Sequence, residues 1–146
     1  MATVTYSFSP NTKAQSGQVN SNFDQLANEI LPTFVVTITG TLTTGTSLTP
    51  ILIVPQDLLI LKAYAAVKTA PVGANIVVDI NVNGTSIWNT TPANRLSIVA
   101  GSDTGNQTLF DTTQLSDGDL LTFDLDTVGS STAGADITIE LRCEWR

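Results

Sequence analysis

The stretch Ile76–Trp88, IVVDINVNGTSIW, decides how this chain is expected to fold. Residues 76–82 are rich in β-branched and apolar side chains, which favour an extended strand. Asn83 and Gly84 follow, and Asn-Gly suits a two-residue hairpin turn because both of its central positions need positive φ. Residues 85–88 then continue as the return strand. The stretch therefore predicts a β-hairpin that turns at Asn83 and Gly84.

Strand patterns continue on both sides of this hairpin. Residues 34–39 alternate apolar and polar side chains, and residues 58–67 form a longer strand that is expected to be partly buried on both faces. Further strands are predicted at 95–99, 108–110, 120–125 and 137–145. Turn-forming residues separate these strands, at 90–92, 101–105, 116–119 and 129–134.

About eight short strands at regular spacing predict an all-β fold, an antiparallel β-sandwich made of two sheets. A jelly-roll-like arrangement is the preferred prediction, because a jelly roll places about eight strands in two sheets. An immunoglobulin-like arrangement is the alternative, since the number of strands does not separate the two. With 146 residues the chain has the size of one domain, and we assign the sandwich to residues 34–146.

Residues 1–33 differ from the rest of the chain. An extended, polar arm that includes Tyr6 and Phe8 is expected first, and Ser16 then offers an N-cap for a short helix. Pro32 ends this helix, because the residue before a proline avoids the helical region. The apolar residues of the helix are spaced by four, three and four positions, which places them on one stripe: Val19, Phe23, Leu26 and Ile30.

The apolar stripe needs a surface to pack against, since a helix of about fifteen residues is marginal alone in water. One possibility is the chain's own sandwich. The other is a further copy of the chain or a neighbouring subunit, which the spacing also suits because it matches two heptads of a coiled coil. We favour the contact between chains.

The composition argues against two classes of partner. The net charge of −7 and the sequence pI of about 4.1 describe an acidic chain, which repels nucleic-acid phosphates and anionic lipid headgroups. No Lys or Arg occurs between Lys13 and Lys62, and residues 1–10 lack the features of a secretory signal. The apolar cluster 51–66 is interrupted by Pro55 and charged residues, so we expect neither a membrane span nor a nucleic-acid site.

The reactive side chains of common enzymes are scarce. The chain has no histidine, which removes the usual general base and the Ser-His-Asp arrangement. Its one cysteine, Cys143, alternates with Leu141 and Trp145 and is predicted to be a packed apolar residue. No glycine-rich phosphate-binding motif is present. We therefore expect no catalysis, no cofactor and no metal site.

Carboxylates are the remaining candidates for chemistry. Asp117 and Asp119 flank Gly118, which is ordinary turn chemistry, although paired carboxylates can also hydrolyse glycosides. Asp124 and Asp126 alternate with apolar residues and are expected on the solvent side of a strand, where alternate carboxylates can also contribute to a calcium site. Asp79 is expected in a similar, solvent-facing position. We favour structural roles for all five: Asp79, Asp117, Asp119, Asp124 and Asp126.

Two tryptophans, Trp88 and Trp145, could form a platform for a sugar ring. Aromatic residues make up only 6% of the chain, so we expect each of the two tryptophans to lie in the core or in an interface. We favour that second interpretation.

The segment Phe8–Leu26, FSPNTKAQSGQVNSNFDQL, resembles an N-terminal segment that is common in structural proteins of tailed bacteriophages. In those proteins a helix with the pattern V-N-x-N-F-x-x-L precedes a fibre or decoration domain. The residues that match this pattern here are Val19, Asn20, Asn22, Phe23 and Leu26. Segments 67–73, 78–84, 118–119, 126–129 and 134–136 resemble β-rich domains of the same class of protein.

The resemblance implies a homotrimer in the virion that binds the major capsid protein or another virion protein. The absence of a fibrous repeat favours a head decoration (cement) protein on the outer surface of the head, and a receptor- or glycan-binding head or tail fibre is the alternative. In either case the arm and helix are the expected contact, through Tyr6, Phe8, Val19, Asn20, Asn22, Phe23, Leu26 and Ile30.

Overall fold

The computed structural model describes residues 17, 19 and 31–146. Gly17 and Val19 are helical, as the sequence predicts for that region, and Val19 is half-buried. The predicted arm and the other residues of the predicted helix lie outside the described residues. The first strand begins at Thr33, one residue before the expected boundary of the sandwich.

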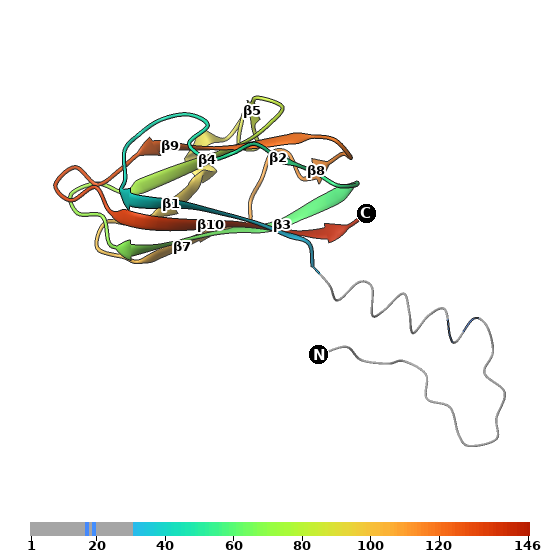
Figure 1. Ribbon diagram of the computed structural model, residues 1–146, viewed down its shortest axis with the longest axis horizontal. Helices are drawn as coiled ribbons and strands as arrows, with labels where there is room; N and C mark the ends of the chain where they lie inside the picture. The colour runs from blue at the N-terminus through green and yellow to red at the C-terminus, as the bar shows by residue number, and fades with distance from the viewer. Residues whose placement is uncertain (1–16, 18, 20–30) are drawn as a thin grey trace, which may run out of the picture.

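Two antiparallel sheets, here called sheet A and sheet B, face each other as layers (Figure 1). In sheet A the strand order is β1 (Thr33–Thr41), β10 (Ala135–Trp145), β3 (Leu58–Thr69), with β7 (Thr104–Gln107) and β8 (Gln114–Leu115) both along the far edge of β3. In sheet B it is β2 (Leu52–Ile53), β9 (Leu120–Thr127), β4 (Ile76–Val82), with β5 (Thr85–Ser86) and β6 (Leu96–Ile98) both along the far edge of β4. A single 3-10 turn, η1 (Pro92–Asn94), precedes β6.

This strand order is that of a jelly roll. Each sheet has four strand positions, because β5 and β6 share one position and β7 and β8 share another. The chain alternates between the sheets from β1 to β4, stays in sheet B through β6, crosses to sheet A for β7 and β8, and alternates again through β9 and β10. The two chain-terminal strands pair with each other in sheet A. The prediction of a jelly-roll sandwich is confirmed, and the immunoglobulin-like alternative does not describe this topology.

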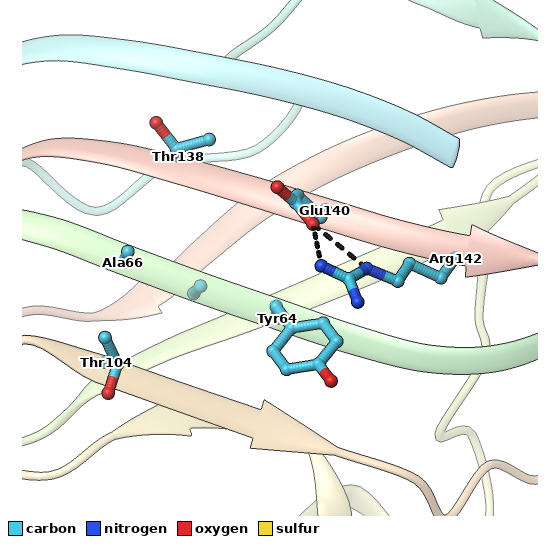
Figure 2. Close-up of a pocket in the computed structure, with 7 residues that line it drawn as sticks. Tyr64, Ala66, Thr104, Thr138, Glu140 and Arg142 are labelled. Atoms are coloured by element: carbon cyan, nitrogen blue, oxygen red, sulfur yellow. Dashed lines mark hydrogen bonds and ion pairs between the residues drawn. The ribbon is translucent and has the colours of Figure 1, made fainter. Parts of the chain in front are cut away.

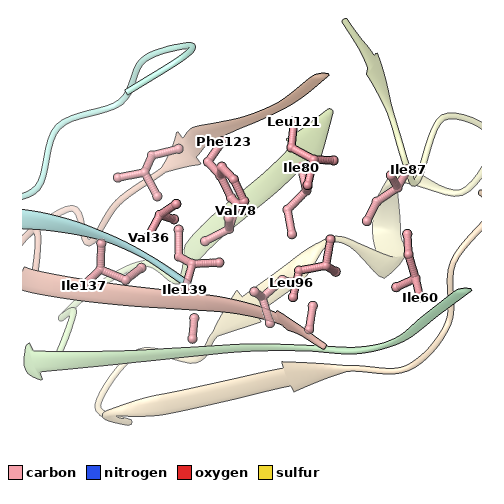
Figure 3. Close-up of a cluster of buried hydrophobic side chains, with 14 of the residues drawn as sticks. Val36, Ile60, Val78, Ile80, Ile87, Leu96, Leu121, Phe123, Ile137 and Ile139 are labelled. Carbon is pink, nitrogen blue, oxygen red and sulfur yellow. The ribbon is translucent and has the colours of Figure 1, made fainter. Parts of the chain in front are cut away.

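The hydrophobic core fills the space between the sheets (Figure 3). It follows from the period of two in each strand, because alternate residues point to the same face. In β10 the alternate residues Ile137, Ile139, Leu141 and Cys143 are buried, and in β9 Leu121, Phe123 and Leu125 are buried. The core that the structure describes is built from residues between Val36 and Cys143.

The hairpin at Asn83 and Gly84 is present as predicted. Strands β4 and β5 pair through Asn81 with Ser86, and the two turn residues have φ of 51° and 81°. The return strand is shorter than expected, because it ends at Ser86. The next residue, Ile87, still donates a backbone hydrogen bond to Ile80 of β4 at 2.9 Å, and both Ile87 and Trp88 are fully buried in the core.

The strand predicted at 108–110 is wrong; the strand lies four residues earlier, at Thr104–Gln107. Gly105 made this segment look like a turn, but here the glycine serves close packing. A Cβ atom on Gly105 would collide with the carbonyl oxygen of Ser97, where sheet B approaches β7. The strand then ends because the Gln107 side chain accepts hydrogen bonds from the backbone N–H groups of Thr108 and Leu109, at 2.8 and 3.0 Å.

A β-bulge in β3 determines which of its residues face outward. Arg142 pairs with Lys62 while Cys143 pairs with Ile60, so Leu61 is the extra residue. Before the bulge Leu58 and Ile60 point into the core, and after it Ala63, Ala65 and Val67 do. The residues that consequently lie on the outer face of sheet A are Lys62, Tyr64, Ala66 and Lys68.

Candidate functional site

The expected contact residues of the arm and helix fall almost wholly outside the described part of the chain. Val19 is the exception, as a half-buried helical residue. The structure therefore does not test whether these residues form a contact surface: Tyr6, Phe8, Asn20, Asn22, Phe23, Leu26 and Ile30. What it does show is where they join the sandwich. Pro32 accepts a hydrogen bond from the backbone N–H of Cys143 at 2.9 Å, so the N-terminal segment joins at the end where β10 finishes (Figure 1).

The thiol of Cys143 is not accessible to solvent in the folded protein. It is fully buried in the core, as predicted for a packed apolar residue. Burial raises the pKa of its thiol to about 12, so almost none of it is thiolate at neutral pH.

The strand carboxylates lie on the outer face of sheet B, where they bind other groups of the protein. Arg95 forms ion pairs with Asp79 at 2.9 Å and with Asp126 at 3.0 Å. The hydroxyl of Ser86 also donates to Asp79, at 2.6 Å. The expectation that Asp79 faces solvent is wrong: it is only 5% exposed, because the side chains of Arg95 and Ser86 cover it.

Burial and pairing act on Asp79 in opposite directions. Desolvation raises its pKa, while the hydrogen bond from Ser86 and the charge of Arg95 lower it, and the net shift is upward from the ordinary 3.8. Arg95 therefore recovers only part of the cost of burying this carboxylate. The Asp79 carboxyl group therefore has a structural role, in which Arg95 and Ser86 hold it in place.

The other aspartates also take part in local structure. Asp124 accepts hydrogen bonds from the buried amide of Asn81 at 2.8 Å and from the backbone N–H of Ser47 at 2.6 Å. Asp119 accepts from Asn83 and from the backbone N–H of Ser116, each at 2.8 Å, which confirms its predicted role in a turn. These bonds hold the neighbouring loops to sheet B, which gives both carboxylates a structural role.

Among residues 17, 19 and 31–146, no three carboxylate, thiol or imidazole side chains gather into a group that could hold a metal ion. No helix in the same part of the chain is long and apolar enough to cross a membrane.

The two tryptophans have different environments. Trp88 is fully buried, donates from Nε1 to the Leu109 carbonyl at 2.7 Å, and lies against Phe110 with ring centroids 5.5 Å apart. It is a core residue, so it cannot form a sugar platform. Trp145, near the end of β10, is 36% exposed.

The outer face of sheet A carries an open depression that the sequence did not single out (Figure 2). Three adjacent strands provide its side chains: β3 supplies Tyr64 and Ala66, β7 supplies Thr104, and β10 supplies Thr138, Glu140 and Arg142. They meet because Tyr64 pairs directly with Glu140, and Ala66 pairs with both Thr138 and Thr104. The small side chain of Ala66, in the middle of the face, leaves the space open.

The polar groups of this depression are preorganised around Tyr64. Both Nε and Nη2 of Arg142 donate to Glu140, at 3.2 and 3.0 Å (Figure 2). The guanidinium carbon of Arg142 lies 4.3 Å from the centre of the Tyr64 ring, and the ammonium of Lys62 lies 4.4 Å from it. Each of the two cations is attracted to the ring, because the face of an aromatic ring is negative.

A second depression adjoins the first and shares Thr138 with it. It is lined by Thr37 and Thr39 of β1, and by Lys68 and Asp136. Together the two form what we call the sheet A groove, running across the outer face from Arg142 to Lys68. Sequence reasoning missed it because its residues are far apart in the chain, and only the pairing register brings them together.

No family model matches this sequence, and no curated protein matches it either.

Proposed function

We propose that this protein is a non-enzymatic structural component of a bacteriophage virion, in which the N-terminal segment anchors the jelly roll to the particle surface. One observation carries the proposal. The described core is built from residues between Val36 and Cys143, which all belong to the sandwich, and we assign attachment to the N-terminal segment that joins it at Pro32. The resemblance of residues 8–26 to N-terminal segments of phage structural proteins supports the same assignment.

The position of the junction suits an anchor. Pro32 is fixed to Cys143 at one end of the sandwich, next to the exposed Leu31, so a segment attached there can reach a neighbouring subunit while both sheets stay accessible. We propose the major capsid protein as the partner, with the head exterior as the location. We also propose that three copies assemble through the stripe of Val19, Phe23, Leu26 and Ile30.

The side chains argue for structure over catalysis. Asp79, Asp119 and Asp124 are engaged in the protein's own hydrogen bonds and ion pairs, and Cys143 is buried. A catalytic carboxylate pair would need one member held in an apolar pocket that a substrate can reach. Asp79, the buried carboxylate, instead lies beneath Arg95.

Deleting residues 1–31 tests the proposal. The sandwich should still unfold cooperatively, but it should no longer co-sediment with particles that lack this protein. Full occupancy of the particles by the truncated protein would show that the anchor lies elsewhere.

A matched pair of full-length variants tests the stripe itself. Phe23→Ser with Leu26→Ser changes the predicted apolar stripe, whereas Gln25→Ser with Asn28→Ser changes the opposite face of the predicted helix. Only the first pair should reduce co-sedimentation and the trimer mass measured by light scattering. An equal loss in both pairs would contradict a stripe-specific contact.

A receptor-binding fibre module is the second candidate, and the sheet A groove is the observation that favours it. The isolated protein should then adsorb to host cells, and prior incubation with excess protein should slow phage adsorption. Absence of both effects would remove this candidate.

A further inference from the structure

We propose that the sheet A groove binds an oligosaccharide that carries a carboxylate, with the acidic sugar unit next to Lys62 and Arg142. This ligand site is independent of the proposed anchor, because it lies on the sandwich and uses only residues of β1, β3, β7 and β10. The argument rests on the shape of the groove, on its polar groups and on the distribution of charge.

The shape favours a chain of sugar units. Along β3, Tyr64 and Lys68 are four residues apart, which corresponds to about 13 Å at roughly 3.3 Å per residue. The two depressions meet at Thr138, so one extended ligand can occupy both. The groove is open and has a small residue, Ala66, at its centre, which suits a ligand that lies flat on the sheet.

The polar groups favour a ligand with many hydroxyls. Thr37, Thr104 and Thr138 each present a hydroxyl along the groove, and a hydroxyl can both donate and accept a hydrogen bond. Glu140 adds an acceptor whose position is fixed by its two hydrogen bonds from Arg142. Alternating donors and acceptors above a floor of Ala66 and sheet backbone fit the polar edges and the apolar faces of a sugar ring.

The distribution of positive charge favours a ligand that carries a carboxylate. Outside the N-terminal segment the chain has five basic residues, and three of them, Lys62, Lys68 and Arg142, lie on this one face. Among the described residues, no carboxylate lies within ion-pairing distance of Lys62 or Lys68, whereas Arg95 and Arg142 both have carboxylate partners. In an acidic protein, an ammonium held over Tyr64 and free of a carboxylate is the natural partner for an anionic ligand group.

The same observations disfavour the other anionic polymers. A nucleic acid carries a phosphate at every step, and the net charge of −7 opposes so dense a negative charge. An extended peptide usually binds by pairing with a free strand edge, but the centre of the groove lies over β3 and β10, which are inside the sheet and whose backbone groups are already paired. Recognition at the centre of the groove must therefore use side chains.

Binding to immobilised saccharides tests the proposal, with the full-length protein as the probe. Oligogalacturonic acid and sialyllactose represent the acidic class, and maltohexaose and lactose represent the neutral class. We expect the acidic class to bind at least tenfold more tightly at low salt, and we expect the preference to weaken as salt increases.

Three variants locate the site. Ala66→Trp fills the groove and should abolish binding, and Lys62→Gln should weaken it about tenfold or more, as expected for a lost charge-assisted hydrogen bond. Arg146→Gln removes the same charge outside the groove and should change affinity by less than about twofold. Thermal unfolding confirms that each variant is folded.

Several results would overturn the proposal. These are binding to none of the saccharides, equal binding of acidic and neutral saccharides, or binding that Ala66→Trp leaves intact. Binding of single-stranded DNA or an acidic peptide in preference to the saccharides would assign the groove to a different class of ligand. Because the anchor is tested on truncated and stripe variants, either proposal can fail without the other.

Discussion

On the outer face of sheet B, Arg95 forms ion pairs with Asp79 and Asp126. The hydroxyl of Ser86 also donates a hydrogen bond to Asp79. On the outer face of sheet A, Lys68 lines an open groove and Lys62 lies over the ring of Tyr64 at its other end, and neither has a carboxylate partner among the described residues. Both faces are polar and both belong to one sandwich. The difference is that the arginine on the outer face of sheet B is held by two carboxylates, one of them buried, while two lysines on the outer face of sheet A have no carboxylate partner among the described residues.

The same substitution on the two faces should have very different effects on stability. Arg95→Met leaves Asp79 buried without its cation, and we expect a loss of about 2 to 3 kcal/mol in the free energy of unfolding. Arg142→Met breaks an exposed pair with Glu140, and we expect a loss of at most about 1 kcal/mol. Urea unfolding of both variants measures the difference. Equal losses would mean that the two faces are energetically alike.

The pH dependence of stability should reveal the buried carboxylate of sheet B. The folded pKa of Asp79 is raised, so its contribution to stability is fully present below about pH 3.8 and is lost as pH rises through the folded pKa. Asp79→Asn removes this dependence. Compared with the variant, the wild-type protein should therefore become relatively less stable as pH rises from 3 toward neutrality, in unfolding curves recorded at each pH.

Asp111 should show the opposite sign. Its carboxylate accepts hydrogen bonds from the backbone N–H groups of Thr90 and Thr91, at 2.7 and 2.8 Å, and from the Thr91 hydroxyl at 2.8 Å. Desolvation raises its pKa, but these hydrogen bonds outweigh that effect and the net pKa is lowered. The stability it contributes is present above about pH 3.8 and is lost as pH falls through the lowered folded pKa.

The Asp111→Asn variant tests this directly. Its disadvantage relative to the wild-type protein should shrink as the solution is acidified, whereas the disadvantage of Asp79→Asn should grow. If both variants changed in the same direction with pH, the assignment of opposite shifts would be wrong.

The smallest effects on stability are expected in the groove. Lys68→Gln and Thr138→Val alter side chains that face solvent or the open groove, so each should change the free energy of unfolding by less than about 0.5 kcal/mol. Larger losses would show that the groove residues support the fold. Retained stability together with weaker saccharide binding would sharpen the contrast with sheet B.

Local patterns were sufficient to predict much of the fold. The Asn83–Gly84 turn and the bounds of β4 follow from residues that are neighbours in sequence, and the alternation in β9 and β10 identifies their buried faces. The position of β7 could not be predicted in this way. Gly105 favours a turn locally, but it pairs with Ala65 of β3, which is distant in sequence, and its close approach to Ser97 of β6 leaves no room for a side chain.

The site was less accessible to sequence reasoning than the fold. Asp79 looked like any solvent-facing strand residue, because the arginine that covers it is sixteen positions away and comes from another strand connection. The groove depends on the pairing of Tyr64 with Glu140, a register that the bulge at Leu61 shifts by one residue. A signal was present in the alternation of Lys62, Tyr64, Ala66 and Lys68, but only the structure shows what faces them.

Imaging of the assembled particle, at a detail that orients the sandwich, tests the central claim most directly. We predict that the end of the sandwich at Pro32 and Cys143 points to the capsid and that the sheet A groove faces outward. Density that joins the capsid to the outer face of sheet A, with Lys62 and Lys68 covered by a capsid subunit, would contradict the account.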